Sequence, residues 1–217
     1  MAVDPIAVIQ SEAVRIMAAY AANPGGKVPW SDRWSVNSVA RHVAGSHHVV
    51  AQIIEDRPTA DFGRFETLDP PAKGDPGFPA WSAAGTEALV AQCRFVPAIE
   101  TAWTPHPTVG STVGFWVGHM ATETLIHRWD AEAGAGITGP AMDPEVAAHA
   151  VDEYLDLAEA GRSTLHPQPI DVALSLRGRA EALALLLWGR LDADGAGVDV
   201  DGDREVLARW NELVPSA

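Results

Sequence analysis

The chain has 217 residues, 47% of them apolar, and its formal net charge is -14 at pH 7. This acidity argues against nucleic acid or an anionic membrane as a partner, because both attract basic surfaces. A single cysteine, Cys93, excludes an internal disulfide and a zinc site made of cysteines. The sequence has no apolar run of the ~20 residues that span a bilayer, and its N-terminus lacks the basic cluster of a signal peptide. We therefore expect a cytoplasmic protein, monomeric or homodimeric, whose partners are small molecules.

Four segments of the first 140 residues combine apolar residues at helical spacing with signals that start or stop a helix. Asp4 is a candidate N-cap, and Pro5 follows it at the first helical position. The predicted helices are residues 6–22, 35–56, 79–95 and 112–133. Between the second and third helices, the prolines and glycines of residues 58–79 predict a long surface loop. We expect the four helices to form an antiparallel bundle.

The remaining residues predict a smaller and more mixed structure. A fifth helix should begin at Asp143-Pro144-Glu145, where a cap residue is followed by proline. Residues 170–176 and 197–203 are predicted strands, residues 179–191 a helix, and a last helix should run through Trp210. The predicted fold class is mainly α, with a helical bundle domain at 1–140, a connecting helix and linker at 141–166, and a small α/β C-terminal domain at 167–217.

Glu123 and His127 are the residues that point most directly to chemistry. They are four apart in the fourth predicted helix, so their side chains project from the same face, as two metal ligands would. His119 and Asp130 share that face, and Asp130 is placed to accept the ring N–H of His127. A solvated polar face is the alternative, because Glu-x-x-x-His is a weak pattern by itself.

A third ligand is available from the second predicted helix. His42 lies at one edge of the apolar stripe of this helix and His47 at the other edge, so the spacing leaves both open as ligands. His48 should point away into solvent. Three protein ligands would leave one coordination position open, which is the arrangement of a reactive metal site.

Several strings in the chain resemble the mycothiol-dependent maleylpyruvate isomerase family, which has a DinB-like metal-binding four-helix bundle. The strings are Trp34-Ser35-Val36 before His42, Phe115-Trp116-Val117, Glu123 to Glu132, Leu185 to Arg190, and Val200 to Arg204. The resemblance implies a divalent metal, most often zinc, bound by His42, Glu123 and His127. It also implies mycothiol as the thiol cosubstrate, with its sulfur at the open coordination position.

The chain departs from this family just before the second ligand. Where the family commonly has Arg-Arg-Met-Ala-His-Glu, this sequence has Gly118-His119-Met120-Ala121-Thr122-Glu123. Arginine is the natural bidentate partner of a dicarboxylate such as maleylpyruvate. We therefore expect a wider and less positive pocket at positions 118 and 122, a bulkier or less anionic electrophile, and partial recovery of maleylpyruvate activity on restoring arginine at 118.

Three further residues are candidates for the site. His119 is a candidate catalytic residue, and Trp116 is a candidate pocket wall for the cofactor. Arg190 is a candidate contact for a substrate or thiol carboxylate, although a role at the C-terminus of a helix is equally compatible with its position. The expected function is mycothiol S-transfer to an electrophilic small molecule. The alternatives are maleylpyruvate-type cis-trans isomerisation, metal-assisted hydrolysis, and a metal-binding or regulatory module without turnover.

Overall fold

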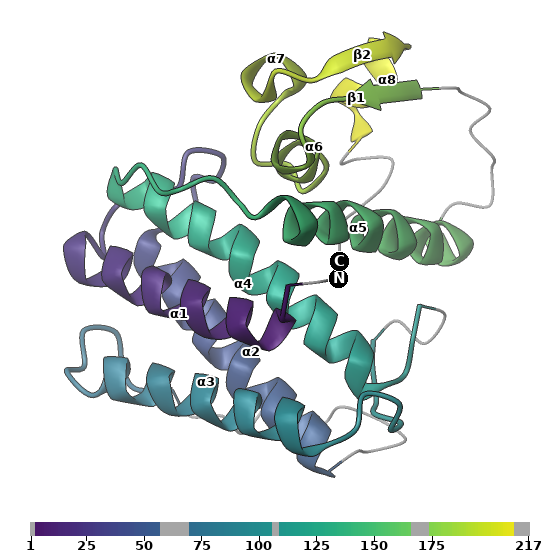
Figure 1. The fold of residues 1–217 in the computed structure, drawn as a ribbon. Coiled ribbons are helices and arrows are strands. Elements are labelled where there is room, and N and C mark those ends of the chain that lie inside the picture. The colour runs from purple at the N-terminus through teal and green to yellow at the C-terminus, as the bar shows by residue number, and fades with distance from the viewer. Residues whose placement is uncertain (1–2, 57–69, 106–108, 166–173, 211–217) are drawn as a thin grey trace. The chain divides into compact units, whose positions relative to one another are not determined.

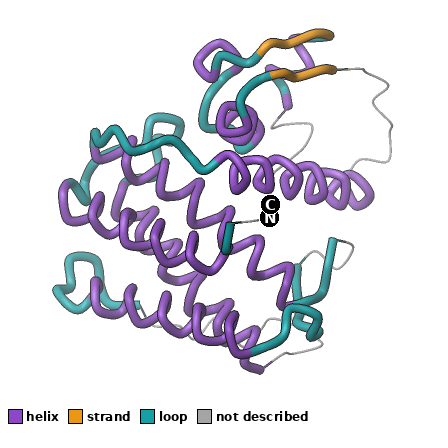
Figure 2. Tube along the Cα trace, in the orientation of Figure 1, coloured by secondary structure: helices purple, strands orange, loops and turns teal. Residues whose placement is uncertain are grey.

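The computed structural model describes residues 3–56, 70–105, 109–165 and 174–210. The chain divides into two compact units, one of residues 3–140 and one of residues 1–2 with 141–217. Helices make up most of the described residues of both units, and the two strands both belong to the second (Figure 2). The mainly α fold predicted from the sequence is confirmed. Most of the predicted loop at 58–79, the last residue of the predicted linker, 166, and the first residues of the predicted strand at 170–176 lie outside the described residues.

Four long helices build the first unit. They are α1 (Pro5–Ala22), α2 (Val36–Asp56), α3 (Phe78–Phe95) and α4 (Val113–Ala135). Local capping explains where α1 and α4 begin, because Asp4 accepts a hydrogen bond from the Ile6 amide and Thr112 accepts one from the Phe115 amide. Helix α4 ends at Gly136, whose φ of 74° is a left-handed conformation that glycine adopts readily.

The bundle is antiparallel between two pairs of helices and parallel within each pair (Figure 1). Within the α1–α4 pair, Glu12 contacts Arg128 and Arg15 contacts Glu132, so both helices advance in the same direction. Arg41 and His48 of α2 likewise meet Phe78 and Trp81 of α3 in increasing order. For α2 and α3 to be parallel, the connection between them must return along the length of α2, which is ~31 Å. The 21 residues of 57–77 are enough, because an extended chain of that number reaches well beyond this distance.

One apolar core fills the end of the bundle where α1 finishes and α2 begins. Phe78 is its largest aromatic residue at 1% exposure, and it packs with Val36, Val39 and Ile16 and against the ring of Tyr20. Burying a side chain of this size stabilises the fold by about 1.5–3 kcal/mol. This core holds the first turns of α2 in place, and His42 follows them on the same helix.

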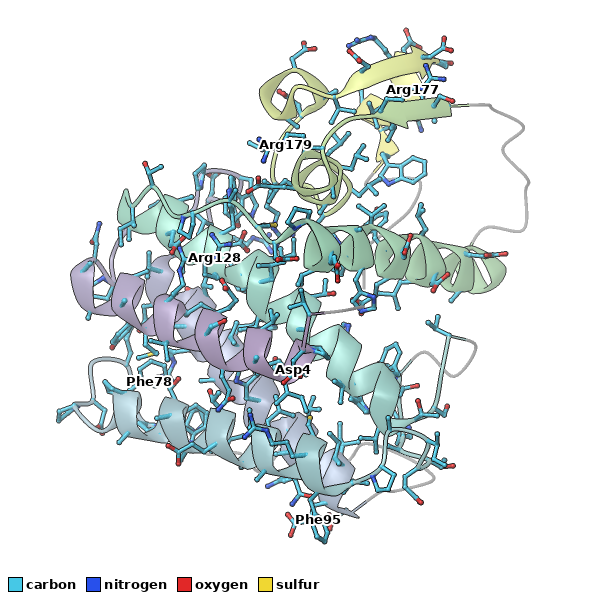
Figure 3. All side chains as sticks on the ribbon, viewed as in Figure 1. Asp4, Phe78, Phe95, Arg128, Arg177 and Arg179 are labelled. Carbon is cyan, nitrogen blue, oxygen red and sulfur yellow. The ribbon has the colours of Figure 1, made fainter. Side chains whose placement is uncertain are left out.

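A buried network of charges joins α1 to α4. Arg128 is 2% exposed and lies within the first unit (Figure 3). Its guanidinium donates to Glu12 over 2.7 Å, to Glu132 over 2.9 Å and to the Pro140 carbonyl over 3.2 Å. Arg15 donates to the other carboxylate oxygen of Glu132. Because the charges alternate and are hydrogen-bonded, each offsets the desolvation cost of its neighbour.

The second unit contains α5 (Pro144–Leu165), β1 (Leu174–Arg177), α6 (Ala180–Leu187), α7 (Ala193–Ala196), β2 (Asp199–Gly202) and α8 (Arg204–Ala208). The strands pair antiparallel, with Leu174 opposite Gly202 and Arg177 opposite Asp199. Trp188, after α6, donates its indole N–H to the Ala150 carbonyl of α5 over 3.0 Å and packs edge-on against Tyr154. Within the described residues, no helix is long and apolar enough to cross a membrane.

Candidate metal centre

Helices α2 and α4 bring His42, Glu123 and His127 to one point in the first unit. Nε2 of His42 lies 2.7 Å from Oε1 of Glu123, and Nε2 of His127 lies 3.3 Å from the same oxygen. One ligand atom from each of the three residues lies within 4.8 Å of the other two. A tetrahedral zinc ion with bonds of about 2.0–2.1 Å keeps its ligands about 3.3–3.4 Å apart, which falls within this spread. The two imidazole nitrogens and one carboxylate oxygen therefore fit a small divalent cation.

The three residues differ in exposure in a way that suits a site open to a small molecule. The His42 side chain is 40% exposed, that of Glu123 16% and that of His127 8%. Within the first unit, the centre is thus most accessible at His42 on α2 and least accessible at His127 on α4.

The electrostatics of Glu123 and His127 favour the charged forms of both residues. Burial by itself raises the pKa of Glu123, but His127, His42 and His119 together hold that pKa well below its usual value. Burial lowers the pKa of His127, whereas the charge of Glu123 and the hydrogen bonds to Asp130 and Glu123 raise it to about 9. A carboxylate that stays ionised at neutral pH is the form that binds a cation.

Asp130 holds the far side of the His127 ring. Nδ1 of His127 donates to Oδ2 of Asp130 over 2.7 Å, and both side chains are buried. This contact, expected from the three-residue spacing, leaves Nε2 facing Glu123 and His42. A carboxylate behind a histidine is the usual outer partner that orients a metal-binding imidazole.

Trp34 is a residue of this centre that sequence reasoning did not place in the site. Its indole lies parallel to the His127 ring, with centroids 5.6 Å apart and an angle of 5°, and meets the His42 ring edge-on at 5.2 Å. The sequence offered one signal, because Trp34 belongs to the string that resembles the family. Its position eight residues before His42, in a loop, gave no reason to expect contact with His127.

The two other histidines of α2 have different surroundings. His47 is completely buried and lies 3.0 Å from the hydroxyls of both Thr86 on α3 and Thr124 on α4. Burial lowers its pKa to about 4, while the charge of Glu123 acts in the opposite direction and the charges of His48 and His42 lower the pKa further. Its contacts with the two threonines make it a buried link between three helices.

His48, expected in solvent, instead stacks on Trp81 at 4.3 Å and contacts the Trp81 carbonyl, because α3 packs over it.

His119 lies one turn before Glu123 on the same face of α4. Its charge contributes to lowering the pKa of Glu123. Its ring stacks on Phe115 at 5.4 Å and 12°, and meets Trp116 edge-on at 5.7 Å. Trp116 itself is 5% exposed and donates its indole N–H to the Trp103 carbonyl over 2.7 Å. The three rings form an aromatic cluster next to the candidate metal centre.

Gly118 and Thr122, where a wider pocket is expected, both lie away from the open side of the candidate metal centre. Thr122 is completely buried, and its hydroxyl has no hydrogen-bond partner within the described part of the chain. At 100° per residue, Gly118 lies about 140° around α4 from Glu123, whereas His119 lies about 40° away. The substitution that faces the site is therefore the histidine at 119, and restoring arginine at 118 would not bring it to the ligands.

Arg190 belongs to the second unit, where it follows α6. Its guanidinium donates to the carbonyl of Trp188, the residue that caps the C-terminus of this helix. This contact supports the capping role that the sequence left open beside a role in binding carboxylates. A cation at this position also interacts favourably with the helix dipole.

A known protein family matches the part of the chain that contains these features. The family model described as the mycothiol maleylpyruvate isomerase N-terminal domain matches residues 9–132, more than half of the chain. The chain belongs to this family. The resemblance inferred from the strings between Trp34 and Glu132 is thereby confirmed. Comparisons with curated proteins and with solved structures return no significant match.

The match to the mycothiol maleylpyruvate isomerase N-terminal domain covers the whole site. Residues 9–132 include His42, Glu123, His127 and Asp130, together with Trp34. All of the second unit lies outside the matched residues. The family assignment therefore concerns the helical bundle that holds the candidate metal centre.

Proposed function

We propose that the protein is a divalent-metal-dependent enzyme that uses mycothiol to attack an electrophilic small molecule, as a mycothiol S-transferase does. The observation that supports this most directly is the convergence of His42, Glu123 and His127 within 4.8 Å. A site of two histidines and one carboxylate is typical of catalytic zinc, and we propose zinc as the ion. Membership of a family named for mycothiol supports the choice of thiol.

A bound divalent cation would favour the thiolate over the thiol at neutral pH and so supply the nucleophile. Metal binding would displace the proton that His127, with its pKa of about 9, keeps at neutral pH. The imidazoles of His42 and His127 would then be neutral, and the single charge of Glu123 would balance the cation. The centre would keep a net positive charge, which favours an anionic partner. Asp130 keeps the ring of His127 in the orientation that presents Nε2.

The protein's own thiol is unsuited to this role. Cys93 is the only cysteine of the chain, and it is buried in α3. Burial raises the pKa of its thiol to about 12, so almost none of it is thiolate at neutral pH. A thiol enzyme built on this chain therefore requires a thiol from a small molecule.

In the proposed transfer, the electron pair of the thiolate sulfur forms a bond to an electrophilic carbon. The leaving group departs with its bonding pair, and the sulfur stays attached to the product. His119 is our candidate for proton transfer to the leaving group, because it lies on the face of Glu123 and its ring is held by Phe115. Trp116 supports His119 from the side.

Maleylpyruvate-type isomerisation is the second candidate, favoured by the name of the family. In that reaction the thiolate adds to a double bond, the adduct rotates about the resulting single bond, and the thiol is expelled. We prefer transfer because a histidine stands at position 119, where the family commonly has an arginine suited to a dicarboxylate. The two reactions differ in their products, since only transfer leaves sulfur attached.

The test combines metal analysis with product analysis. Purified protein should contain one divalent ion per chain, and it should form a mycothiol-containing product from at least one member of a panel of alkyl halides, epoxides and activated alkenes. His42→Ala should lose both properties. His48→Ala, on the same helix but stacked on Trp81, is the matched control and should keep both. Turnover without added thiol would support metal-assisted hydrolysis instead, and a metal-free wild-type protein would contradict the proposal.

A further inference from the structure

Trp34 reaches the candidate metal centre from the loop between α1 and α2. The indole is half-buried and packs at the edge of the apolar core around Phe78. One face of it lies parallel to the His127 ring at 5.6 Å, and its edge contact with His42 is at 5.2 Å. Ring pairs with centroids 4.5–7 Å apart attract each other beyond the burial of their area. Trp34 thus contacts two of the three candidate ligands at once.

The two imidazoles depend on Trp34 to different degrees. His127 also has Asp130, which holds its Nδ1 over 2.7 Å. For His42, the contacts given by the structure are the Glu123 carboxylate and the rings of Trp34 and His127. His42 is also the most exposed of the three ligands. Apart from the Glu123 carboxylate, which is itself a candidate ligand, the aromatic rings of Trp34 and His127 are therefore what restrains the rotation of this ring among the described residues.

The backbone holds the loop in a specific position. The Val28 amide donates to the Trp34 carbonyl over 3.3 Å, and the Val36 amide donates to the Gly26 carbonyl over 2.9 Å. Gly26 lies directly against the end of α4, where a Cβ added to it would be 2.0 Å from the Gly134 carbonyl oxygen. Only a glycine permits this approach without a shift of the backbone. The loop that bears Trp34 is thereby seated against the helix that bears Glu123 and His127.

We infer that Trp34 is a positioning residue that orients the His42 and His127 imidazoles for metal binding. This inference rests on the metal site of the proposed function. Residues that orient metal ligands typically change metal affinity by 10- to 100-fold when they are replaced. We expect the effect of Trp34 near the lower end of that range, because Asp130 still orients His127.

The experiment measures zinc affinity by competition with a chromophoric chelator, and the visible spectrum of the cobalt-substituted protein. Trp34→Leu should weaken zinc binding about tenfold and change the cobalt spectrum, because a ligand ring is no longer held. Trp34→Phe, which keeps an aromatic face, should recover most of the affinity. Trp30→Leu is the matched control, since Trp30 is half-buried in the same loop but packs against Trp129, with the two rings tilted by 35°. It should leave the affinity and the spectrum unchanged.

A variant in the backbone of the same loop, away from the ligands, also tests the role of Trp34. Gly26→Ala must displace the loop from Gly134, so it should weaken zinc binding although it touches no ligand. Equal affinities and equal cobalt spectra for Trp34→Leu, Trp30→Leu and the wild type would overturn the inference while leaving the metal site intact. A wild-type protein that binds neither zinc nor cobalt would overturn the proposed function itself, and this inference with it.

Discussion

Asp130 accepts a hydrogen bond of 2.7 Å from Nδ1 of His127, the residue one turn before it on α4. Both side chains are buried, so the contact is shielded from water. We predict that Asp130→Ala weakens zinc binding by about 10- to 100-fold, as expected for the loss of an outer carboxylate. Asp130→Asn keeps an acceptor oxygen without the charge and should fall between Ala and the wild type. Equal zinc affinities across the three proteins would contradict this role.

The buried charges around Arg128 give a prediction about stability. Arg128→Ala leaves Glu12 and Glu132 without their shared partner, and breaking a buried ion pair on one side costs about 3–5 kcal/mol. The free energy of unfolding in urea measures the effect. Arg94→Ala is the control, because Arg94 makes one exposed hydrogen bond to Gln10, and it should cost less than about 1 kcal/mol. Similar costs for both variants would contradict the structural role of the network.

His47 gives a prediction about pH. Its pKa is lowered from 6.5 to about 4 by burial, so the unfolded chain binds a proton more readily than the folded chain between these values. Stability from neutral His47 is fully present above pH 6.5 and is lost as pH falls toward 4, by about 3 kcal/mol in all. Urea unfolding of the wild type and of His47→Gln should show the difference, with a shallower loss in the variant. Parallel pH profiles would contradict it.

Substrate choice gives a fourth prediction. Because His119 replaces an arginine of the family on the face of Glu123, maleylpyruvate should be a poor substrate of the unaltered protein. Losing a charge-assisted contact costs about 1.5–3 kcal/mol, or about ten- to a hundredfold in kcat/KM. His119→Arg should recover part of this activity, whereas Gly118→Arg, on another side of α4, should not. Efficient maleylpyruvate isomerisation by the unaltered protein would restore isomerisation as the leading candidate.

Much of the fold follows from local signals in the sequence. Asp4, Thr112 and Gly136 mark the ends of α1 and α4 through contacts within a few residues, so sequence alone places these ends to within about two residues. The parallel direction of α2 and α3 has no such signal, because it depends on the route of the connection between them. Bundles with short loops are antiparallel throughout, and that default misses this arrangement.

The site was predictable where its residues share one helix. Glu123, His127 and Asp130 follow from helical spacing on α4. The choice of His42 over His47 required the family resemblance, because only the packing of α3 shows that Thr86 covers His47. The place of Trp34 in the site was not predictable from spacing, since its contact with His127 depends on the packing of the loop at Gly26 against the end of α4. Contacts between segments distant in the chain are what spacing along one helix cannot show.

The proposed function requires that His42, Glu123 and His127 bind an ion that the enzyme needs for mycothiol chemistry. The most direct measurement is mass spectrometry of products formed with and without mycothiol by the metal-loaded wild type and by Glu123→Gln, with metal content determined on the same samples. Glutamine nearly preserves the shape of Glu123 but removes its charge. We predict one ion per chain and a mycothiol-dependent product for the wild type, and loss of both for the variant. Unchanged metal content in Glu123→Gln, or a wild-type product that forms equally well without mycothiol, would contradict the proposed function.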